Sequence, residues 1–286
     1  MKILIATLCP GATVSVEHYL SVIETLSVFK QELPEIEFKI GNIATSVSAY
    51  ARNALASKVL NDPSFSHILF VDSDLGFHPS LIVRMLAFGK PLVGCVHPDK
   101  KFDYKRFHNS RLAADDAQIA RYVATDCVGG GSAVITTSGP KGERQPQFTD
   151  GFVRVNYASA SLLLIRRDVL VLMKDRFPEL WLENPGANYR ESGLQGGALQ
   201  CFASYPGPDG VFLRDDVAFC RRWVEGCDGE IWSCIDESIV RTGDEPFIGQ
   251  YLLKMTQEGI LVIESSSAEA MPPPPAEAAG EGVQAN

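Results

Sequence analysis

Short apolar runs alternate with segments of helical periodicity over the first 96 residues of the chain. The apolar runs predict strands at residues 2–7, 35–40, 67–71 and 91–96. Between them, apolar side chains recur at helical spacing and predict helices at residues 16–29, 46–60 and 79–88. This alternation is typical of an α/β fold in which a parallel sheet carries helices on both faces.

The pattern is less regular beyond Pro98. Residues 100–150 are expected to form a surface insertion with one helix near 113–122, and residues 182–211, rich in Gly, Pro and Asn, a long functional loop. Further elements are predicted, namely strands at 152–156, 160–165 and 230–234, a helix ending near 176 and a helix at 215–226. We expect one domain over residues 1–263 and a disordered, low-complexity tail over 264–286.

Charge and composition restrict the class of protein. The chain has 26 Lys and Arg against 35 Asp and Glu, a net charge of 26 − 35 = −9, so no nucleic-acid partner is expected. No apolar run approaches the roughly 18–20 residues that cross a bilayer. Seven cysteines without a CxxC pair, and an N-terminus that suits a strand better than a secretion signal, favour a reduced, cytoplasmic protein. The oligomeric state is left open.

The strongest candidate for chemistry is a pair of carboxylates at the end of a predicted strand, in Phe70-Val71-Asp72-Ser73-Asp74. Ligands of open α/β sheets bind at the carboxyl edge of the strands. Two carboxylates there suit Mg²⁺ or Mn²⁺, which take their remaining ligands from substrate phosphates and water. The alternative is a polar turn that caps the following helix.

Several further segments occur in an order that resembles a known family. They are Ile5-Ala6-Thr7 with Pro10, Ala51-Arg52-Asn53-Ala54-Leu55, Val93 to Pro98, Ser161 to Arg167, Arg214 to Arg222, and Arg241-x-Gly243-x5-Gly249-x-Tyr251. Together with Phe70 to Asp74, they resemble the motifs of GT-A-fold glycosyltransferases, in particular the small bacterial and phage enzymes. The resemblance covers residues 1–251, and Asp215 stands where that family usually has Glu.

The resemblance implies a Rossmann-like, mostly parallel sheet with helices on both faces. The nucleotide-binding half would span residues 1–98 and the acceptor-side half 99–263. The implied activity is metal-assisted transfer of a sugar from a nucleotide-sugar donor, most simply a UDP-sugar, to the hydroxyl group of an acceptor.

The resemblance also implies roles for individual residues. Asp74 would ligate Mn²⁺ or Mg²⁺ on the donor diphosphate, and Asp72 would contact the ribose or the same metal. Asp216, with Asp215 beside it, would act as the general base of an inverting displacement. The donor would be contacted by further residues, with Thr7 and Pro10 bordering the base and ribose and Arg52 and Asn53 near the nucleotide or diphosphate. From the sequence alone, Arg52 could equally be a solvated helix charge, and Asp215 and Asp216 could complement a helix dipole.

Position 241 departs from the family pattern. The family often has a metal-binding His there, whereas Arg241 has no free lone pair for a cation. Arg241 is predicted to pair with the donor diphosphate and to supplement or partly replace the metal's charge; the alternative is a weakened or inactive site. Of the histidines, His78 and His97 lie near the predicted sheet edge and could approach the site.

Two other functions remain open. One is a non-catalytic protein that binds nucleotide sugars without turnover. The other is a phosphatase of the haloacid-dehalogenase type, whose DxDx[TV] motif also follows an apolar strand, although Gly76 takes the Thr/Val place here. Trp181, beside the 182–211 loop, is the one tryptophan suspected of stacking on a sugar.

Overall fold

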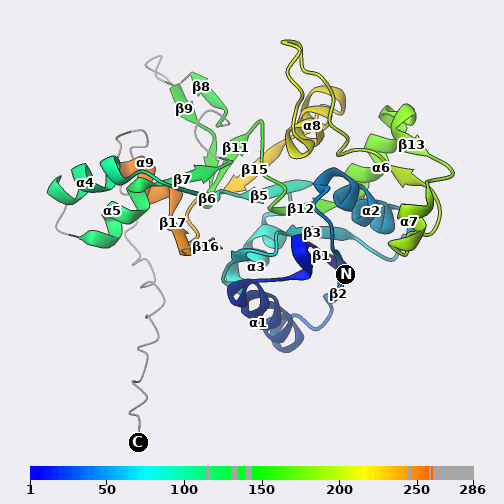
Figure 1. Ribbon diagram of the computed structural model, residues 1–286, viewed down its shortest axis with the longest axis horizontal. Helices are drawn as coiled ribbons and strands as arrows, with labels where there is room; N and C mark the ends of the chain where they lie inside the picture. The colour runs from blue at the N-terminus through cyan, green and yellow to red at the C-terminus, as the bar shows by residue number, and fades with distance from the viewer. Residues whose placement is uncertain (114–115, 130–133, 139–143, 244–245, 258, 260–286) are drawn as a thin grey trace, which may run out of the picture.

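The computed structural model of the protein describes residues 1–113, 116–129, 134–138, 144–243, 246–257 and 259 (Figure 1). The predicted tail at 264–286 lies outside these residues. The main sheet has eight strands, in the order β10-β11-β15-β5-β12-β3-β1-β2 (Figure 1). These strands are β1 (Lys2–Leu8), β2 (Glu37–Ile43), β3 (His67–Val71), β5 (Leu92–Cys95), β10 (Phe148–Thr149), β11 (Phe152–Val155), β12 (Leu162–Arg166) and β15 (Ile231–Cys234).

The sheet is mixed, which corrects the prediction of a mostly parallel sheet. Strands β1–β2, β1–β3 and β5–β15 pair in parallel, whereas β3–β12, β5–β12, β11–β15 and β10–β11 pair antiparallel. Strand β12 lies between β3 and β5 in the opposite direction. Its residues Leu162 to Ile165 are all buried, and a fully buried run has the same sequence pattern in either direction.

Helices cover both faces of the sheet, as predicted. Successive side chains of a strand point to opposite faces, and β1 accordingly sends Ile3 and Ile5 into one core cluster and Leu4 and Ala6 into another. The first cluster is completed by α1 and α3, and the second by α2 and α6 (Figure 1). The bounds of these helices are α1 (Val16–Glu32), α2 (Ser48–Asn61), α3 (Pro79–Phe88) and α6 (Arg167–Arg176).

Helix α1 buries a face that its apolar pattern did not predict. Val16, Tyr19, Leu20 and Ile23 are exposed, with Val16 at 68% and Tyr19 at 56% of their full area. The face toward the sheet carries His18, Ser21, Val22, Thr25 and Phe29. Ser21 accepts a hydrogen bond from the Phe77 backbone N–H at 2.8 Å, and its hydroxyl therefore satisfies a buried donor that an apolar residue would leave unpaired.

The remaining elements lie mostly in the second half of the chain. The helices are α4 (Tyr104–Ala113), α5 (Ala117–Ala124), α7 (Ala187–Glu191), α8 (Asp215–Arg221) and α9 (Tyr251–Gln257), with short turns η1 (Pro10–Ala12), η3 (Pro178–Leu180) and a π-helical turn η4 (Arg222–Gly226). The strands are β4 (Leu75–Gly76), β6 (His97–Phe102), β7 (Thr125–Val128), β8 (Thr136–Ser138), β9 (Arg144–Pro146), β13 (Trp181–Leu182), β14 (Ala198–Leu199), β16 (Ile239–Thr242) and β17 (Pro246–Gly249).

The segment 182–211 is not one long loop, since α7 and β14 lie within it. The predicted helix 215–226 is α8 followed by the π-helical turn, and α4 was not predicted. Within the described part of the chain, no helix combines the length and apolar character of a membrane span.

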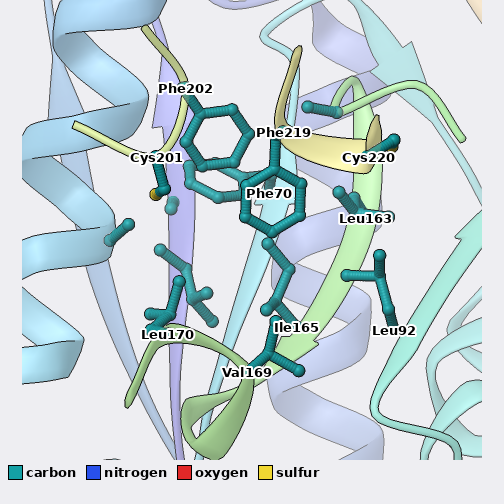
Figure 2. Close-up of a cluster of buried hydrophobic side chains, with 14 of the residues drawn as sticks. Phe70, Leu92, Leu163, Ile165, Val169, Leu170, Cys201, Phe202, Phe219 and Cys220 are labelled. Atoms are coloured by element: carbon teal, nitrogen blue, oxygen red, sulfur yellow. The ribbon is translucent and has the colours of Figure 1, made fainter. Parts of the chain in front are cut away.

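Three aromatic rings connect the sheet to α8. Phe70 of β3 lies edge-on to Phe202 with ring centroids 5.5 Å apart, and Phe202 stacks on Phe219 of α8 at 4.3 Å (Figure 2). All three side chains are fully buried. Because Phe70 comes two residues before Asp72 and Phe219 comes three after Asp216, this packing fixes the relative placement of the two acidic motifs.

Replacing Phe70 with Ala should lower the free energy of unfolding by about 3–5 kcal/mol, because the change leaves a cavity between the sheet and α8. Urea denaturation measures the difference. Phe148→Ala is the matched control, since Phe148 is 51% exposed, and it should change stability by only about 0.5 kcal/mol. A cost below about 1 kcal/mol for Phe70→Ala would contradict the packing described.

Candidate functional site

The Asp72 to Asp74 turn is held by backbone hydrogen bonds at the carboxyl end of β3. The Asp72 N–H donates to the Ser161 carbonyl at 2.8 Å, and the Asp72 carbonyl oxygen lies 3.0 Å from Nδ1 of His18. The Ser73 carbonyl accepts from the Ser15 N–H at 2.8 Å, just before α1. The turn is therefore fixed by the start of α1 and by the strand β12.

The short strand β4 brings Arg241 to this turn. Leu75 and Gly76 pair antiparallel with Val240 and Arg241 of β16, and the Thr242 N–H donates to the Asp74 carbonyl at 2.8 Å. A Cβ atom on Gly76 would lie 2.7 Å from Cβ of Glu17, so the close approach of α1 requires glycine there.

Two cationic side chains pair with Asp74. Arg241 Nε lies 3.2 Å and Lys100 Nζ 2.8 Å from Asp74 Oδ2, while Arg241 Nη2 lies 3.6 Å from Asp72 Oδ2. Burial alone would raise the pKa of Asp74, but hydrogen bonds and charge from Lys100 and Arg241 outweigh it and lower the pKa. Asp74 is therefore ionised at neutral pH and can act as an oxygen ligand.

The donor atoms at this turn fit a divalent cation that is completed by a substrate. Asp74 Oδ1 is buried and has no hydrogen-bond partner in the described part of the chain, so one carboxylate oxygen beside Asp72 is unpaired. Two carboxylates with phosphate oxygens and water are a usual coordination set for Mg²⁺. Among the described residues, no group of three or more His, Cys, Asp or Glu side chains forms a site made by the protein alone.

Arg52 joins the Asp72 turn to the start of α8. Its Nη1 donates to Asp215 Oδ2 at 2.5 Å, and its Nη2 lies 3.4 Å from Asp72 Oδ1. Burial would lower the pKa of Arg52, but the negative charges of Asp72 and Asp215 outweigh it and raise the pKa. The sequence alone allowed Arg52 to be a solvated charge on the helix surface. The structure excludes this alternative, because only 6% of the residue's surface is exposed.

Asp216 is held by a tyrosine that the sequence did not indicate. The Tyr157 hydroxyl donates to Asp216 Oδ2 at 2.7 Å, and Arg214 Nη2 donates to the same hydroxyl oxygen at 2.8 Å. Asp216 Oδ1 accepts from the Val217 N–H at 2.9 Å. Burial, followed by the charge of Asp216, raises the pKa of Tyr157, so the phenol stays protonated and keeps donating.

Thr7, Pro10 and Asn53 were also predicted to contact the nucleotide-sugar donor, and the structure places them in different surroundings. Thr7, at the end of β1, has Oγ1 3.4 Å from Nε2 of His18, and Pro10 is exposed on η1. The Asn53 side chain is buried, and its Oδ1 accepts from the Phe202 N–H at 2.8 Å, so this amide anchors the segment that follows β14.

Of the histidines that could approach the site, His97 does so. Its Nδ1 lies 3.5 Å from Arg241 Nη1. Burial and then the charge of Arg241 lower the pKa of His97 to about 4, so the imidazole is neutral. His78 instead caps α3, where its Nδ1 accepts from the Ser80 N–H at 3.3 Å.

Neighbouring residues cover the indole ring of Trp181, so the ring is not suited to stacking on a sugar. Lys174 Nζ lies 3.6 Å from the ring centroid, and a Cβ on Gly197 would come within 2.1 Å of the ring. The indole N–H donates to Glu183 at 2.7 Å. These contacts give Trp181 a structural role in packing β13 and β14.

The missed neighbours of the site, Tyr157 and Lys100, come from segments far from either acidic motif. Lys100 belongs to a basic cluster at residues 100–106, for which the sequence favours a solvated face over a mobile loop that closes over the diphosphate. Nothing in the sequence around Tyr157 marks that residue.

Comparisons with known proteins give little similarity. No protein-family model matches the chain, and no curated protein matches it. Among solved structures, the chain is similar to A197 from STIV, with 14% sequence identity, a TM-score of 0.41, and coverage of 85% of this chain and 87% of that one. The function of this chain must therefore be inferred from its own residues.

Proposed function

We propose that this chain is a glycosyltransferase of the GT-A type that transfers a sugar from a nucleotide-sugar donor to an acceptor hydroxyl. The observation that carries the proposal is the meeting of two acidic pairs. Asp72 and Asp74 leave the carboxyl end of β3, and Asp215 and Asp216 begin α8, with Arg52 in contact with both motifs. A leaving-group site beside a candidate base is what a displacement at a sugar carbon requires.

The donor diphosphate is proposed to lie against the Asp72 turn, with Thr7 and Pro10 toward the base and ribose. Arg241 and Lys100 supply positive charge on one side of this turn. Asp74 Oδ1 and Asp72 would hold Mn²⁺ or Mg²⁺, which when bound supplies charge that stabilises the departing diphosphate.

Asp216 is proposed as the general base. The acceptor oxygen attacks the anomeric carbon of the sugar as the bond from that carbon to the diphosphate oxygen breaks. The acceptor hydroxyl loses its proton to Asp216, and the nucleoside diphosphate leaves with the electron pair of the broken bond. A single displacement of this kind inverts the configuration at the anomeric carbon. The hydrogen bonds from Tyr157 and the Val217 N–H orient the Asp216 carboxylate.

The direct test is transfer or hydrolysis of labelled nucleotide sugars in the presence of Mn²⁺. Release of the nucleoside diphosphate with an inverted sugar product is the expected result. Binding of the same donors without any turnover would instead support a non-catalytic binding protein. The pairing of both Asp72 and Asp74 with Arg241 favours this second candidate, because it already neutralises part of the acidic turn.

Replacing Arg241 with Ala should weaken donor binding by about 10–100-fold, since a hydrogen bond to a charged group contributes about 1.5–3 kcal/mol. Isothermal titration with a UDP-sugar and Mn²⁺ measures the change. Arg166→Ala is the control, because Arg166 makes a surface ion pair with Asp168. Unchanged donor affinity in Arg241→Ala would remove Arg241 from the phosphate site.

A further inference from the structure

Arg52 is the point at which the two acidic motifs meet, and its surroundings differ from those of a phosphate ligand. We propose that Arg52 is a positioning residue that holds Asp72 and Asp215 in a fixed relation and does not bind the donor phosphate. The inference deepens the proposed function and depends on it for the roles of the donor site and of the base.

The burial of Arg52 supports this assignment. The side chain exposes 7% of its area, against 15% for Arg241 and 45% for Lys100. Its Nε is buried and has no hydrogen-bond partner among the described residues, and its two Nη atoms contact carboxylates. Because so little of the side chain is exposed, a phosphate group in the site has little of the Arg52 guanidinium to contact, whereas Arg241 and Lys100 are more accessible.

The charges around Arg52 explain why a cation is needed there. Asp215 and Asp216 expose 9% and 6% of their surfaces, and Asp72 is half-buried. Asp216 has Arg214 3.5 Å away and Asp72 has Arg241 3.6 Å away, but the short contact of Asp215 is with Arg52. Removing the guanidinium would leave a buried carboxylate without its counter-ion.

Arg52 is connected to the proposed sugar transfer through the two carboxylates that it contacts, Asp215 and Asp72. Asp215 is the first residue of α8, and the next residue is the candidate base Asp216, so the Arg52–Asp215 pair fixes where the base begins. Asp72 Oδ1 faces Arg52 while its Oδ2 faces Arg241. The fork of a guanidinium can engage two carboxylates at once in fixed directions, which a lysine ammonium does not reproduce.

The test compares Arg52→Lys with the parent protein in the full chain. Arg52→Lys keeps a positive charge but loses the fork, and it should lower the kcat of sugar transfer at least 10-fold. The KM for the donor, and the Kd of UDP with Mn²⁺, should stay within about 3-fold of the parent. The control is Arg84→Lys, because Arg84 also pairs with two carboxylates, Asp236 at 3.0 Å and Glu237 at 2.7 Å, and belongs to none of the segments that resemble the family. This control should leave kcat unchanged.

A loss of UDP affinity of 30-fold or more in Arg52→Lys, with kcat retained, would overturn the proposal and make Arg52 a phosphate ligand. Equal kcat in Arg52→Lys and the parent would also overturn the proposal. That result would mean that Arg52 contributes to stability and does not position the residues of the reaction.

A double-mutant cycle of Arg52→Gln and Asp215→Asn, measured by urea denaturation, does not require the protein to be enzymatically active. The effects of the two substitutions on the free energy of unfolding are expected to be non-additive, and additive effects would contradict the pairing. If Arg52→Gln does not fold, the same cycle is run with Arg52→Lys. If the parent neither binds UDP nor transfers sugar, the proposed function fails while this cycle still tests the Arg52–Asp215 pair.

Discussion

Replacing Asp216 with Asn should lower the kcat of sugar transfer by about 10²–10⁴-fold, the range that a positioned general base contributes. The amide cannot take the proton of the acceptor hydroxyl, but it is nearly the same size as the carboxylate. Tyr157 and the Val217 N–H donate to different oxygens of the Asp216 carboxylate, so the single amide oxygen can keep one of these two hydrogen bonds. Donor affinity should therefore change little, and the loss should appear in kcat.

Steady-state kinetics with a saturating donor measures this effect. Asp228→Asn is the matched control, because Asp228 is exposed and has a φ of 55°, a conformation that Asn adopts readily. The control should keep the parent rate. A kcat for Asp216→Asn within about 3-fold of the parent would exclude Asp216 as the base and would leave α8 with a structural role.

Replacing Asp74 with Asn should weaken Mn²⁺-dependent donor binding by on the order of 100-fold, because truncating one partner of a close charge pair costs about 2–5 kcal/mol. Asp74 Oδ1 is the carboxylate oxygen of the turn that lacks a hydrogen-bond partner among the described residues, and an amide is a weaker ligand for a hard cation than a carboxylate. Isothermal titration with a UDP-sugar at fixed Mn²⁺ measures the change.

Asp175→Asn is the control for this experiment, since Asp175 is exposed on α6 and should leave the affinity unchanged. The Asp74 substitution also frees Lys100 and Arg241, which pair with Asp74 Oδ2 in the parent. Tighter donor binding in the variant, without any need for Mn²⁺, would show that these two cations bind the diphosphate and that no metal is held by Asp74.

Much of the fold followed from local patterns. The buried run Ile68 to Val71 and the helical spacing around α2 and α3 each predicted an element that the structure contains. The direction of β12 did not follow, because a strand buried on both faces carries no signal of its orientation. The buried face of α1 was also missed, since buried His18 and Ser21 meet polar backbone groups that come from segments distant in the sequence.

The candidate site followed from sequence only where the residues lie close together in the chain. The DxD pair after a buried strand predicted carboxylates at the sheet edge, and the structure has them there. The roles of Tyr157 and Lys100 depend on contacts with residues 59 and 26 positions away, respectively, which no local spacing encodes. The ion pair between Arg52 and Asp215 could not be predicted from the sequence for the same reason, since Asp215 lies 163 positions from Arg52.

The central claim is that the turn formed by Asp72 and Asp74, with Arg241 beside it, binds a nucleoside diphosphate sugar together with a divalent cation. The most direct test is the thermal stability of the full chain with UDP-, GDP-, CDP- and TDP-sugars, each with and without Mn²⁺. A ligand that binds only the folded state at about 100 times its Kd stabilises that state by about 2.7 kcal/mol, which raises the melting temperature measurably. We expect one donor class to raise the melting temperature in the presence of Mn²⁺, and Asp74→Asn to abolish that rise. A melting temperature that none of these donors changes, with or without Mn²⁺, would contradict the account.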